Sequence, residues 1–405
     1  MNQFDHWLTE SYAQHPAFCF DQQPWVIDKA KLAEFSGAYG LIQKHGSQLT
    51  RTQALGCATL CGETLRAIFQ DLETQALDVF EREFLRELHL ETQRITSEEL
   101  SFYQLAPTVR EFNLARQSAP LDVLRLDELR HYFGSFPKET VHEILALGSA
   151  DLSKFREAVA AGKLQRDDLS ISTGPVIKKI IGILNREYRR QGVLDAVGTY
   201  MGQRMSVTGL ALELSVSQAT WWANSLDCLS RPPKTLYAHT DESIWQPKSI
   251  VYLSRVDHDT GPTSCYPGVI DELAIKPLRG LIGRVIGNVG RDRNSPLGTY
   301  YAKQYHQSMT SETFRRHFMR LPAEIRYNSH FGWDIYPGSA AEQALVSREH
   351  LMLGEAGTYI VFDGARLLHR GGMLKQGERV ALQVIFSRPN LYKKIIRRIK
   401  RAAFT

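Results

Sequence analysis

The sequence predicts an α+β protein in which a mainly helical N-terminal region precedes a β-sandwich or β-barrel. Up to about residue 195, apolar residues recur at the spacings of three, four and seven that mark one face of a helix. After about residue 200, short apolar segments rich in β-branched and aromatic residues are bounded by glycine, proline or aspartate, at 249–256, 357–364 and 379–387. Separate short strands joined by loops favour a sandwich or barrel over a parallel α/β sheet.

The helical region, residues 1–195, shows its period at several places. One apolar stripe is formed by Leu77, Phe80, Phe84, Leu88 and Ile95. A second helix is predicted to begin after Pro137, because proline is tolerated in the first turn. A third covers the segment from residue 175 to Gly192, which ends with two arginines and a glycine, as helices often do.

Residues 196–390 form the predicted β-core, and this core contains a long insertion at about 290–350. The insertion is irregular, partly helical in pattern, and rich in tyrosine, histidine and arginine. Segments of this length inside a β-domain are usually functional loops or lids, although a surface embellishment is the alternative.

The composition is that of an ordinary folded protein, with 43% hydrophobic and 23% charged residues. The five cysteines are an odd, scattered set, which predicts reduced thiols rather than a disulfide framework: Cys19, Cys57, Cys61, Cys228 and Cys265. No apolar run approaches the length of a membrane-spanning helix, and no basic start precedes an apolar run at the N-terminus. We therefore expect a cytoplasmic protein.

The positive charge is concentrated in a tail, residues 391–405. Its six lysines and arginines account for more than the whole net charge of +5, so the rest of the chain carries −1 and a general nucleic-acid surface is not supported. Ile395, Ile396 and Ile399 would share one side of a basic amphipathic helix. Such a helix can lie on an anionic membrane, which would point to lipid-linked substrates at the inner face. A frayed or docked terminus is the alternative.

The segment His239-Thr240-Asp241 is the first candidate for chemistry. Residues two apart on an extended chain point to the same side, so the histidine and the carboxylate can reach one metal ion. Such a pair also arises by chance, and the similar His89-Leu90-Glu91 is discarded because it lies in a predicted helix, where residues two apart diverge.

A second segment supplies the partners of this pair. The predicted strand 357–364 leads through a turn to His369, and a glycine-rich hairpin returns on a strand that begins at Arg379. Two histidines and one carboxylate leave three open positions on an octahedral iron(II), as oxygen chemistry requires. Arg379 is a permanent cation that can pair with a carboxylate through two hydrogen bonds.

In their order and spacing, these residues resemble the phytanoyl-CoA dioxygenase-like branch of the iron/2-oxoglutarate oxygenases. The matching residues, over about 150 positions, are His239, Asp241, the strand 249–256, Asp257, Gly261-Pro262, Pro267-Gly268, Gly357, Asp363-Gly364, His369 and Arg379. Val269-Ile270 replaces the usual Ser-His after Pro-Gly, and the insertion is the main departure.

The resemblance implies a double-stranded β-helix with iron held by His239, Asp241 and His369 and 2-oxoglutarate anchored by Arg379. Thr240 and Tyr252 become candidate contacts of the co-substrate. The implied reaction consumes O₂, releases succinate and CO₂, and hydroxylates a C–H bond of a small-molecule, sugar or lipid-linked substrate. Halogenating relatives lack the carboxylate, so the intact Asp241 favours oxygen insertion, desaturation or ring formation.

Two other classes of protein remain open at this point. A metal-dependent hydrolase or isomerase would use the same three ligands without 2-oxoglutarate. A non-catalytic scaffold would bind a membrane or a partner through the basic tail. Finally, the glycine-rich run from Gly280 to Gly290 lacks the spacing of a phosphate-binding loop and is predicted to be a bent strand or loop.

Overall fold

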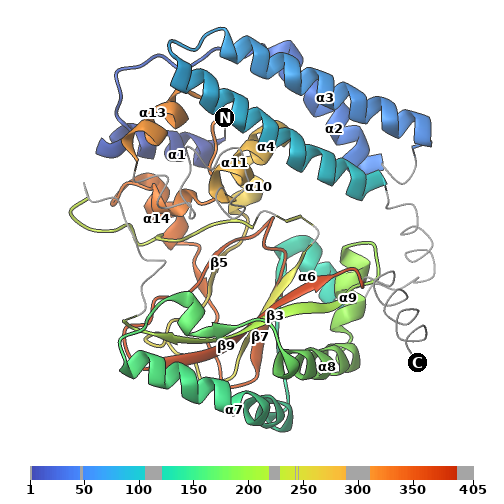
Figure 1. The fold of residues 1–405 in the computed structure, drawn as a ribbon, viewed down its shortest axis with the longest axis vertical. Coiled ribbons are helices and arrows are strands. Elements are labelled where there is room, and N and C mark those ends of the chain that lie inside the picture. Colours follow the sequence, from blue (N-terminus) through green and yellow to red (C-terminus); the bar gives the residue numbers. More distant parts are fainter. Residues whose placement is uncertain are drawn as a thin grey trace, which may run out of the picture.

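In the computed structural model, a layer of helices lies on one side of two antiparallel β-sheets (Figure 1). The structure describes residues 2–45, 49–104, 121–218, 229–241, 243–244, 246–288 and 311–389. The predicted mixture of helices and antiparallel strands is confirmed. The basic tail 391–405, Cys228 and the first part of the insertion, up to residue 310, lie outside the described residues.

The larger sheet has six strands in the order β1-β7-β4-β9-β3-β2, and every neighbouring pair is antiparallel. These strands are β1 (His131–Ser135), β2 (Ser170–Ile171), β3 (Ser206–Val216), β4 (Lys248–Tyr252), β7 (Thr358–Phe362) and β9 (Glu378–Ser387). Three of them, β4, β7 and β9, occupy the three segments where strands were predicted. The expected strands are therefore present, with ends shifted by a few residues.

The smaller sheet has the order β6-β5-β8 and is extended by one isolated bridge between His239 and His369. Its strands are β5 (Ser264–Tyr266), β6 (His350–Leu351) and β8 (Leu368–Arg370). Along the chain, the core segments alternate between the sheets: β3 in the larger, the His239 bridge in the smaller, β4 in the larger, β5 and β6 in the smaller, then β7, β8 and β9 in alternation. The polypeptide therefore winds repeatedly from one sheet to the other.

One face of the larger sheet is covered by helices. These are α6 (Leu121–Leu129), α7 (Lys138–Ala160), α8 (Pro175–Arg190) and α9 (Val193–Tyr200), and Figure 1 shows α7 and α8 on the side away from the helical layer. On β9, Val380, Leu382 and Val384 are buried in the same hydrophobic core as Ile180 and Leu184 of α8. Burial of each such side chain contributes about 1.5–3 kcal/mol. Because strand side chains alternate, Arg379, Ala381, Gln383 and Ile385 face the opposite way.

The helical layer combines the start of the chain with the insertion. It contains α1 (Gln3–Gln14), α2 (Lys29–His45), α3 (Arg51–Glu73) and α4 (Val79–Gln104), together with α10 (Val269–Leu273), α11 (Pro277–Asn288), α13 (Glu312–Arg320) and α14 (Ala340–Val346). Phe84 of α4 and Phe318 of α13 belong to one buried core. A buried ion pair, with 2.6 Å between Arg320 and Glu81, joins the same two helices. The N-terminal helices thus pack on the insertion.

Two strands lie inside the predicted helical region 1–195. The first, β1, pairs with β7 over five residues, and the second, β2, pairs with β3 over two. Neither is long enough to show a clear alternation of apolar and polar residues, which is why the sequence pattern does not reveal them.

The prediction of a bent strand or loop for the run Gly280–Gly290 is wrong, because residues 277–288 form helix α11. The glycines serve close packing instead. A Cβ atom at position 283 would lie 2.9 Å from Cε1 of Tyr327, and one at position 287 would overlap the Ser329 hydroxyl. The segment 327–330 therefore approaches the helix backbone more closely than any other residue would allow.

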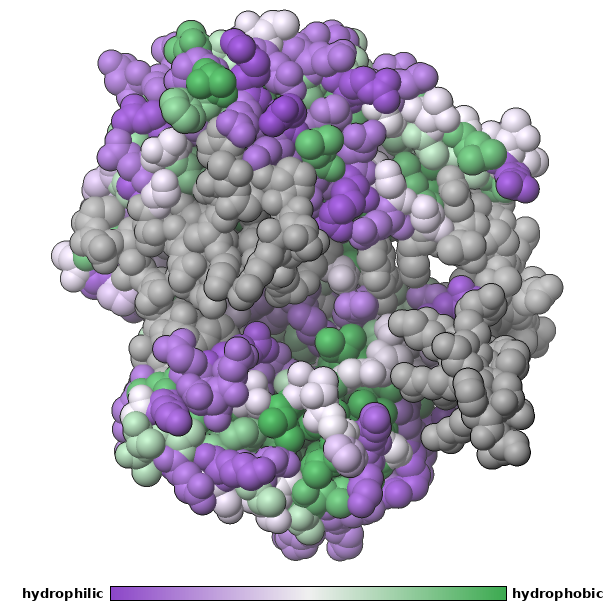
Figure 2. All heavy atoms as spheres, in the orientation of Figure 1, coloured by the Kyte–Doolittle hydropathy of each residue, from purple (hydrophilic) through white to green (hydrophobic). Residues whose placement is uncertain are grey.

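The surface over the helical layer, at the top of Figure 2, is mainly hydrophilic, with hydrophobic side chains exposed singly or in small groups. Of the predicted apolar stripe, Phe84 and Leu88 are buried, whereas Leu77 and Phe80 are exposed near the start of α4. None of the helices in the described ranges has the length and apolar character needed to span a membrane. The four cysteines in those ranges are free thiols.

Candidate metal centre

A pair of backbone hydrogen bonds brings the two predicted histidines together. The N–H of His239 donates to the carbonyl of His369 at 2.9 Å, and the N–H of His369 donates to the carbonyl of His239 at 3.0 Å. Residues that exchange both hydrogen bonds in an antiparallel pair carry their side chains on the same face. The two imidazole rings accordingly lie with their centroids 4.4 Å apart.

Asp241 completes the group. Its backbone N–H donates to the carbonyl of Gly364 at 2.8 Å, which turns the carboxylate toward both rings. His239 Nε2 lies 3.9 Å from Asp241 Oδ1, and His369 Nε2 lies 3.8 Å from Asp241 Oδ2. The Asp241 and His369 residues are only 4% and 7% exposed. The structure therefore places the three predicted ligands in one buried cluster.

Both histidines hold the tautomer that a metal ion requires. The Nδ1 atom of His239 is 2.8 Å from the carbonyl of Tyr237, and that of His369 is 2.9 Å from the carbonyl of Leu367. Since a carbonyl can only accept, each Nδ1 must donate, which leaves the lone pair of each Nε2 free. Burial lowers the pKa of His239 to about 3 and also lowers the pKa of His369, so both rings are neutral at pH 7.

The carboxylate of Asp241 is held in its anionic form. Burial by itself raises its pKa, but the Lys248 ammonium and the two histidines outweigh that effect and leave the pKa well below its ordinary value. Lys248 Nζ donates to Oδ1 at 2.5 Å. The other oxygen, Oδ2, is buried and has no hydrogen-bond partner among the residues described. A buried carboxylate oxygen that faces two free imidazole nitrogens fits a divalent cation.

Arg379 is the fourth predicted residue, and it faces the interior from β9. Its guanidinium donates to the Ser215 hydroxyl at 3.2 Å and to the carbonyl of Gly261. The N–H on Nε is buried and has no partner in the described ranges. Burial lowers the pKa of the guanidinium, and the effects of Tyr252 and Glu213 oppose that shift. A half-buried cation whose Nε–H is buried and unused is suited to an incoming anion.

One cavity of about 520 Å³ joins the metal cluster to Arg379. Its wall includes the three candidate ligands, Arg379, Lys248 and the hydroxyl-bearing Thr263. Apolar side chains complete it, among them Ile250, Phe362 and Ala381. The volume is in the range of ordinary small-molecule sites.

Two further predicted contacts are not brought to this wall. Thr240 is buried, its backbone N–H donates to the carbonyl of Ser329 at 2.8 Å, and it does not line the cavity. The Tyr252 hydroxyl accepts from the N–H of Thr263 at 2.8 Å and donates to the carbonyl of Met352 at 3.0 Å. Tyr252 supports the wall from behind, beside Arg379.

The structure also reveals neighbours of the cluster that the sequence reading missed. Lys248 begins β4, and the sequence pattern places that strand one residue later. The His330 ring stacks on that of His239, with centroids 4.8 Å apart and an angle of 18° between the planes. His330 belongs to the insertion, and nothing in its local spacing relates it to His239. The Phe362 ring lies edge-on to His369 at 4.7 Å.

These side chains define a candidate mononuclear metal centre of two histidines and one carboxylate. No protein-family profile matches the chain. No curated protein sequence matches it either.

Solved structures show a distant similarity. AviO1 from Streptomyces viridochromogenes Tue57 is 10% identical, with a TM-score of 0.35, over 68% of this chain and 97% of its own. EctD from S. alaskensis with bound Fe is 11% identical, with a TM-score of 0.36, over 67% and 78%. The epimerase SnoN in complex with Fe³⁺, alpha ketoglutarate and nogalamycin RO is 13% identical, with a TM-score of 0.33, over 66% and 82%. Such distant matches carry no argument about this site, and its function is inferred from its own geometry.

Proposed function

We propose that this chain is an iron(II)- and 2-oxoglutarate-dependent oxygenase, with iron held by His239, Asp241 and His369. The observation that carries the proposal is the buried cluster itself. Two neutral imidazoles with free Nε2 atoms and one unpaired carboxylate oxygen converge at a cavity that also contains Arg379. The proposal requires His239, Asp241 and His369, through the iron they hold, and Arg379, directly, to bind the same molecule of 2-oxoglutarate.

The winding of the chain between the sheets supports the same proposal. In chain order, the eight core segments lie in the larger, smaller, larger, smaller, smaller, larger, smaller and larger sheet. We propose that they form a double-stranded β-helix, the fold that the family resemblance implies. The ligands then come from the second and seventh segments, which are neighbours in the smaller sheet.

The donor set narrows the choice of metal. Two histidines and one carboxylate suit iron(II) with three open positions, although a catalytic zinc ion uses a similar set. Arg379 favours iron, because a hydrolytic zinc site has no need of a guanidinium with an unused, buried Nε–H in the same cavity. Bound iron would supply the activation of O₂, and the protein would bind, orient and shield the reactants.

Each side chain then has a definite task. The backbone carbonyls of Tyr237 and Leu367 orient the two imidazoles, and Lys248 fixes one oxygen of Asp241 so that the other remains available. Arg379 binds the distal carboxylate of 2-oxoglutarate. The apolar part of the wall excludes water from the reacting atoms. One oxygen atom of O₂ enters succinate, formed with loss of CO₂, and the other hydroxylates a C–H bond of a small-molecule substrate.

The test is visible absorption under anaerobic conditions after addition of iron(II) and then 2-oxoglutarate. Wild-type protein should develop a metal-to-ligand charge-transfer band, and His369→Ala should not. Loss of one partner of a buried charge pair costs about 2–5 kcal/mol, so Arg379→Ala should need at least about 30-fold more 2-oxoglutarate. Arg255→Ala is the matched control, because Arg255 is an exposed arginine in an ion pair with Glu355.

Two results would contradict the proposal in different ways. If folded, iron-loaded wild-type protein gives no band, the chain is not an oxygenase of this class. If the band forms equally well in Arg379→Ala, the anchor is wrong and the hydrolase or isomerase reading gains. The scaffold alternative predicts instead a protein that purifies metal-free and tolerates His239→Ala without loss of function.

A further inference from the structure

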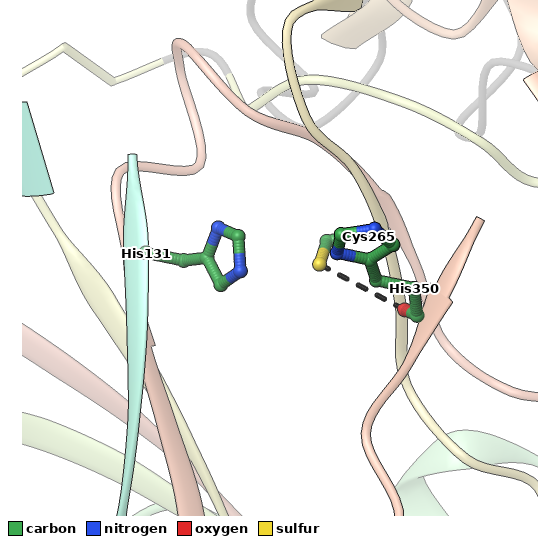
Figure 3. Close-up of side chains that lie close together, drawn as sticks. All are labelled: His131, Cys265 and His350. Carbon is green, nitrogen blue, oxygen red and sulfur yellow. Dashed lines mark hydrogen bonds between the residues drawn. The ribbon is translucent and has the colours of Figure 1, made fainter. Parts of the chain in front are cut away.

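A second cluster of metal-ligating side chains lies outside the candidate iron site. It consists of His131 from β1, Cys265 from β5 and His350 from β6 (Figure 3). One nitrogen or sulfur atom from each of the three residues lies within 4.8 Å of the others. The residues are far apart in the sequence, so only the folded chain brings them together.

Strand register explains why these side chains meet. Cys265 pairs with His350 on one side and with His369 on the other, and paired residues share a face of the sheet. In the larger sheet, His131 pairs with Phe362, whose ring contacts His369. In the smaller sheet, His350, Cys265 and His369 thus lie in one row of paired residues, with one cluster at each end of the row. Phe362, from the facing row of the larger sheet, lies between the two clusters.

The ligand atoms of this second cluster are positioned as in the first. His131 Nδ1 lies 2.8 Å from the carbonyl of Leu129, two residues earlier, so it donates and leaves Nε2 as the free lone pair. Figure 3 shows that Nε2 side of the ring turned toward Cys265 and His350. Both candidate iron-binding histidines use the carbonyl two residues earlier in the same way.

The buried thiol has no strong competing partner in the part of the chain that the structure describes. Cys265 is 2% exposed and His131 is 4% exposed. Among the described residues, the Cys265 thiol makes only one long hydrogen bond, 3.8 Å to the carbonyl of His350, drawn as the dashed line in Figure 3. Immediately before His131, the backbone of Arg130 adopts the left-handed region with a φ of 62°. A non-glycine residue in that region costs about 1–2 kcal/mol, which the fold sustains where it directs His131 inward.

We propose that His131, Cys265 and His350 bind a zinc ion. Two imidazole nitrogens and one thiolate form a donor set that zinc prefers. Zn–N and Zn–S bonds of about 2.1 and 2.3 Å in a tetrahedron need ligand atoms about 3.5 Å apart. Rotation of the exposed His350 side chain would close the gap. The fourth position opens on that exposed side and takes water.

Zinc binding releases one proton, that of the Cys265 thiol. Burial, with Glu349 nearby, raises the pKa of the Cys265 thiol to about 12, so the metal-free thiol is protonated. The sulfur–zinc bond forms as that proton leaves for solvent, with no change of oxidation state. The ion would join β1 at the edge of the larger sheet to β6 at the edge of the smaller one, and so fasten the two sheets beside the cavity.

Cobalt(II) is the probe that separates this site from the iron cluster. A cysteine ligand gives cobalt an intense thiolate charge-transfer band in the near ultraviolet, and the cluster of His239, Asp241 and His369 contains no sulfur. We expect metal-free wild-type protein to develop the band up to one cobalt per chain. Zinc added afterwards should abolish it. The site does not depend on the proposed oxygenase function, so Asp241→Ala should keep the band.

Variants assign the band to its residues. Cys265→Ser should lose it, and His350→Ala should weaken cobalt binding at least about tenfold. Cys61→Ser is the matched control, because Cys61 is also a buried free thiol but belongs to no such cluster of described residues. The proposal is overturned if folded wild-type protein gives no band, or if the band persists in Cys265→Ser. Either result would leave the oxygenase proposal untouched.

Discussion

Gly364 packs directly against a candidate iron ligand, and this contact offers a sharp test of the site. A Cβ atom at position 364 would overlap Oδ2 of Asp241 and lie 2.7 Å from its Cγ. Oδ2 is the carboxylate oxygen that has no hydrogen-bond partner in the described part of the chain. We therefore expect Gly364→Ala to displace the metal-facing oxygen while it leaves every ligand in the sequence.

The size of the effect follows from the geometry. The closest contact, 1.8 Å to Oδ2, must open to at least 3.0 Å, so this oxygen must move by at least about 1.2 Å through a shift or rotation of the carboxylate. The Asp241 backbone cannot follow freely, since its N–H is bonded to the carbonyl of the same Gly364. Disturbing the groups that orient a metal ligand typically lowers metal affinity about 10–100-fold, and displacement of the ligand oxygen itself should reach the upper end of that range. Overpacking should also lower the free energy of unfolding by about 1–3 kcal/mol.

The assay is the iron(II) dependence of the charge-transfer band at saturating 2-oxoglutarate, together with thermal unfolding. Gly371→Ala is the matched control. It lies two residues after His369, and a Cβ there meets nothing within 4 Å. We expect Gly364→Ala to require about 100-fold more iron and Gly371→Ala to match wild type. Equal iron affinity in all three proteins, or an equal loss in both variants, would refute this view of the Asp241 carboxylate.

Three further predictions concern the ligand sphere, the helical layer and acid stability. Lys248→Met removes the donor that orients Asp241 and should weaken iron binding about 10–100-fold. Arg320→Met leaves the buried Glu81 carboxylate without its cation and should lower the free energy of unfolding by about 3–5 kcal/mol. Burial lowers the pKa of His15 from 6.5 to about 4, so its protonation favours the unfolded state. Stability should therefore fall between pH 6.5 and 4, by up to about 3 kcal/mol from this residue.

The checks differ for each of these. For Lys248, iron titration should show the loss, and the metal-free protein should also unfold at a lower temperature, because the buried Asp241 carboxylate loses its cation. For Arg320, urea unfolding should show that Arg320→Met with Glu81→Gln recovers much of the loss, and no recovery would mean that the ion pair is not responsible. For His15, unfolding across the pH range should be less acid-sensitive in His15→Asn, whose side chain can still accept from the N–H of Ala17.

The candidate iron site was accessible to sequence reasoning because its ligands follow local rules. Residues that are two apart on an extended segment point to the same side, and this rule identified His239 and Asp241 as a pair. The strand, turn and hairpin around His369 and Arg379 can also be predicted from local sequence patterns. Thr240 failed as a cavity residue by the same rule, since a residue between two inward-facing neighbours points away.

Features that depend on contacts between distant parts of the chain could not be predicted from the sequence. Lys248 reaches Asp241 only because β4 lies across from the metal-binding segment. The cluster of Cys265 and its two histidines joins three strands that have no common spacing in the sequence. Helix α11 was predicted to be a strand or loop, which is wrong. Its glycines are there because residues 327–330 approach the helix closely, and not because the chain turns.

The joint core of the N-terminal helices and the insertion has a consequence for the newly made chain. Helices α1–α4 are complete by residue 104, yet α13 and α14, which share their core, end only at residues 320 and 346. At about 5–20 residues per second, the first helices wait roughly 10–50 s on the ribosome for the rest of their core. During that interval Phe84 and its neighbours have no permanent cover. The early segment is thus the part of the nascent chain on which a holding chaperone would act.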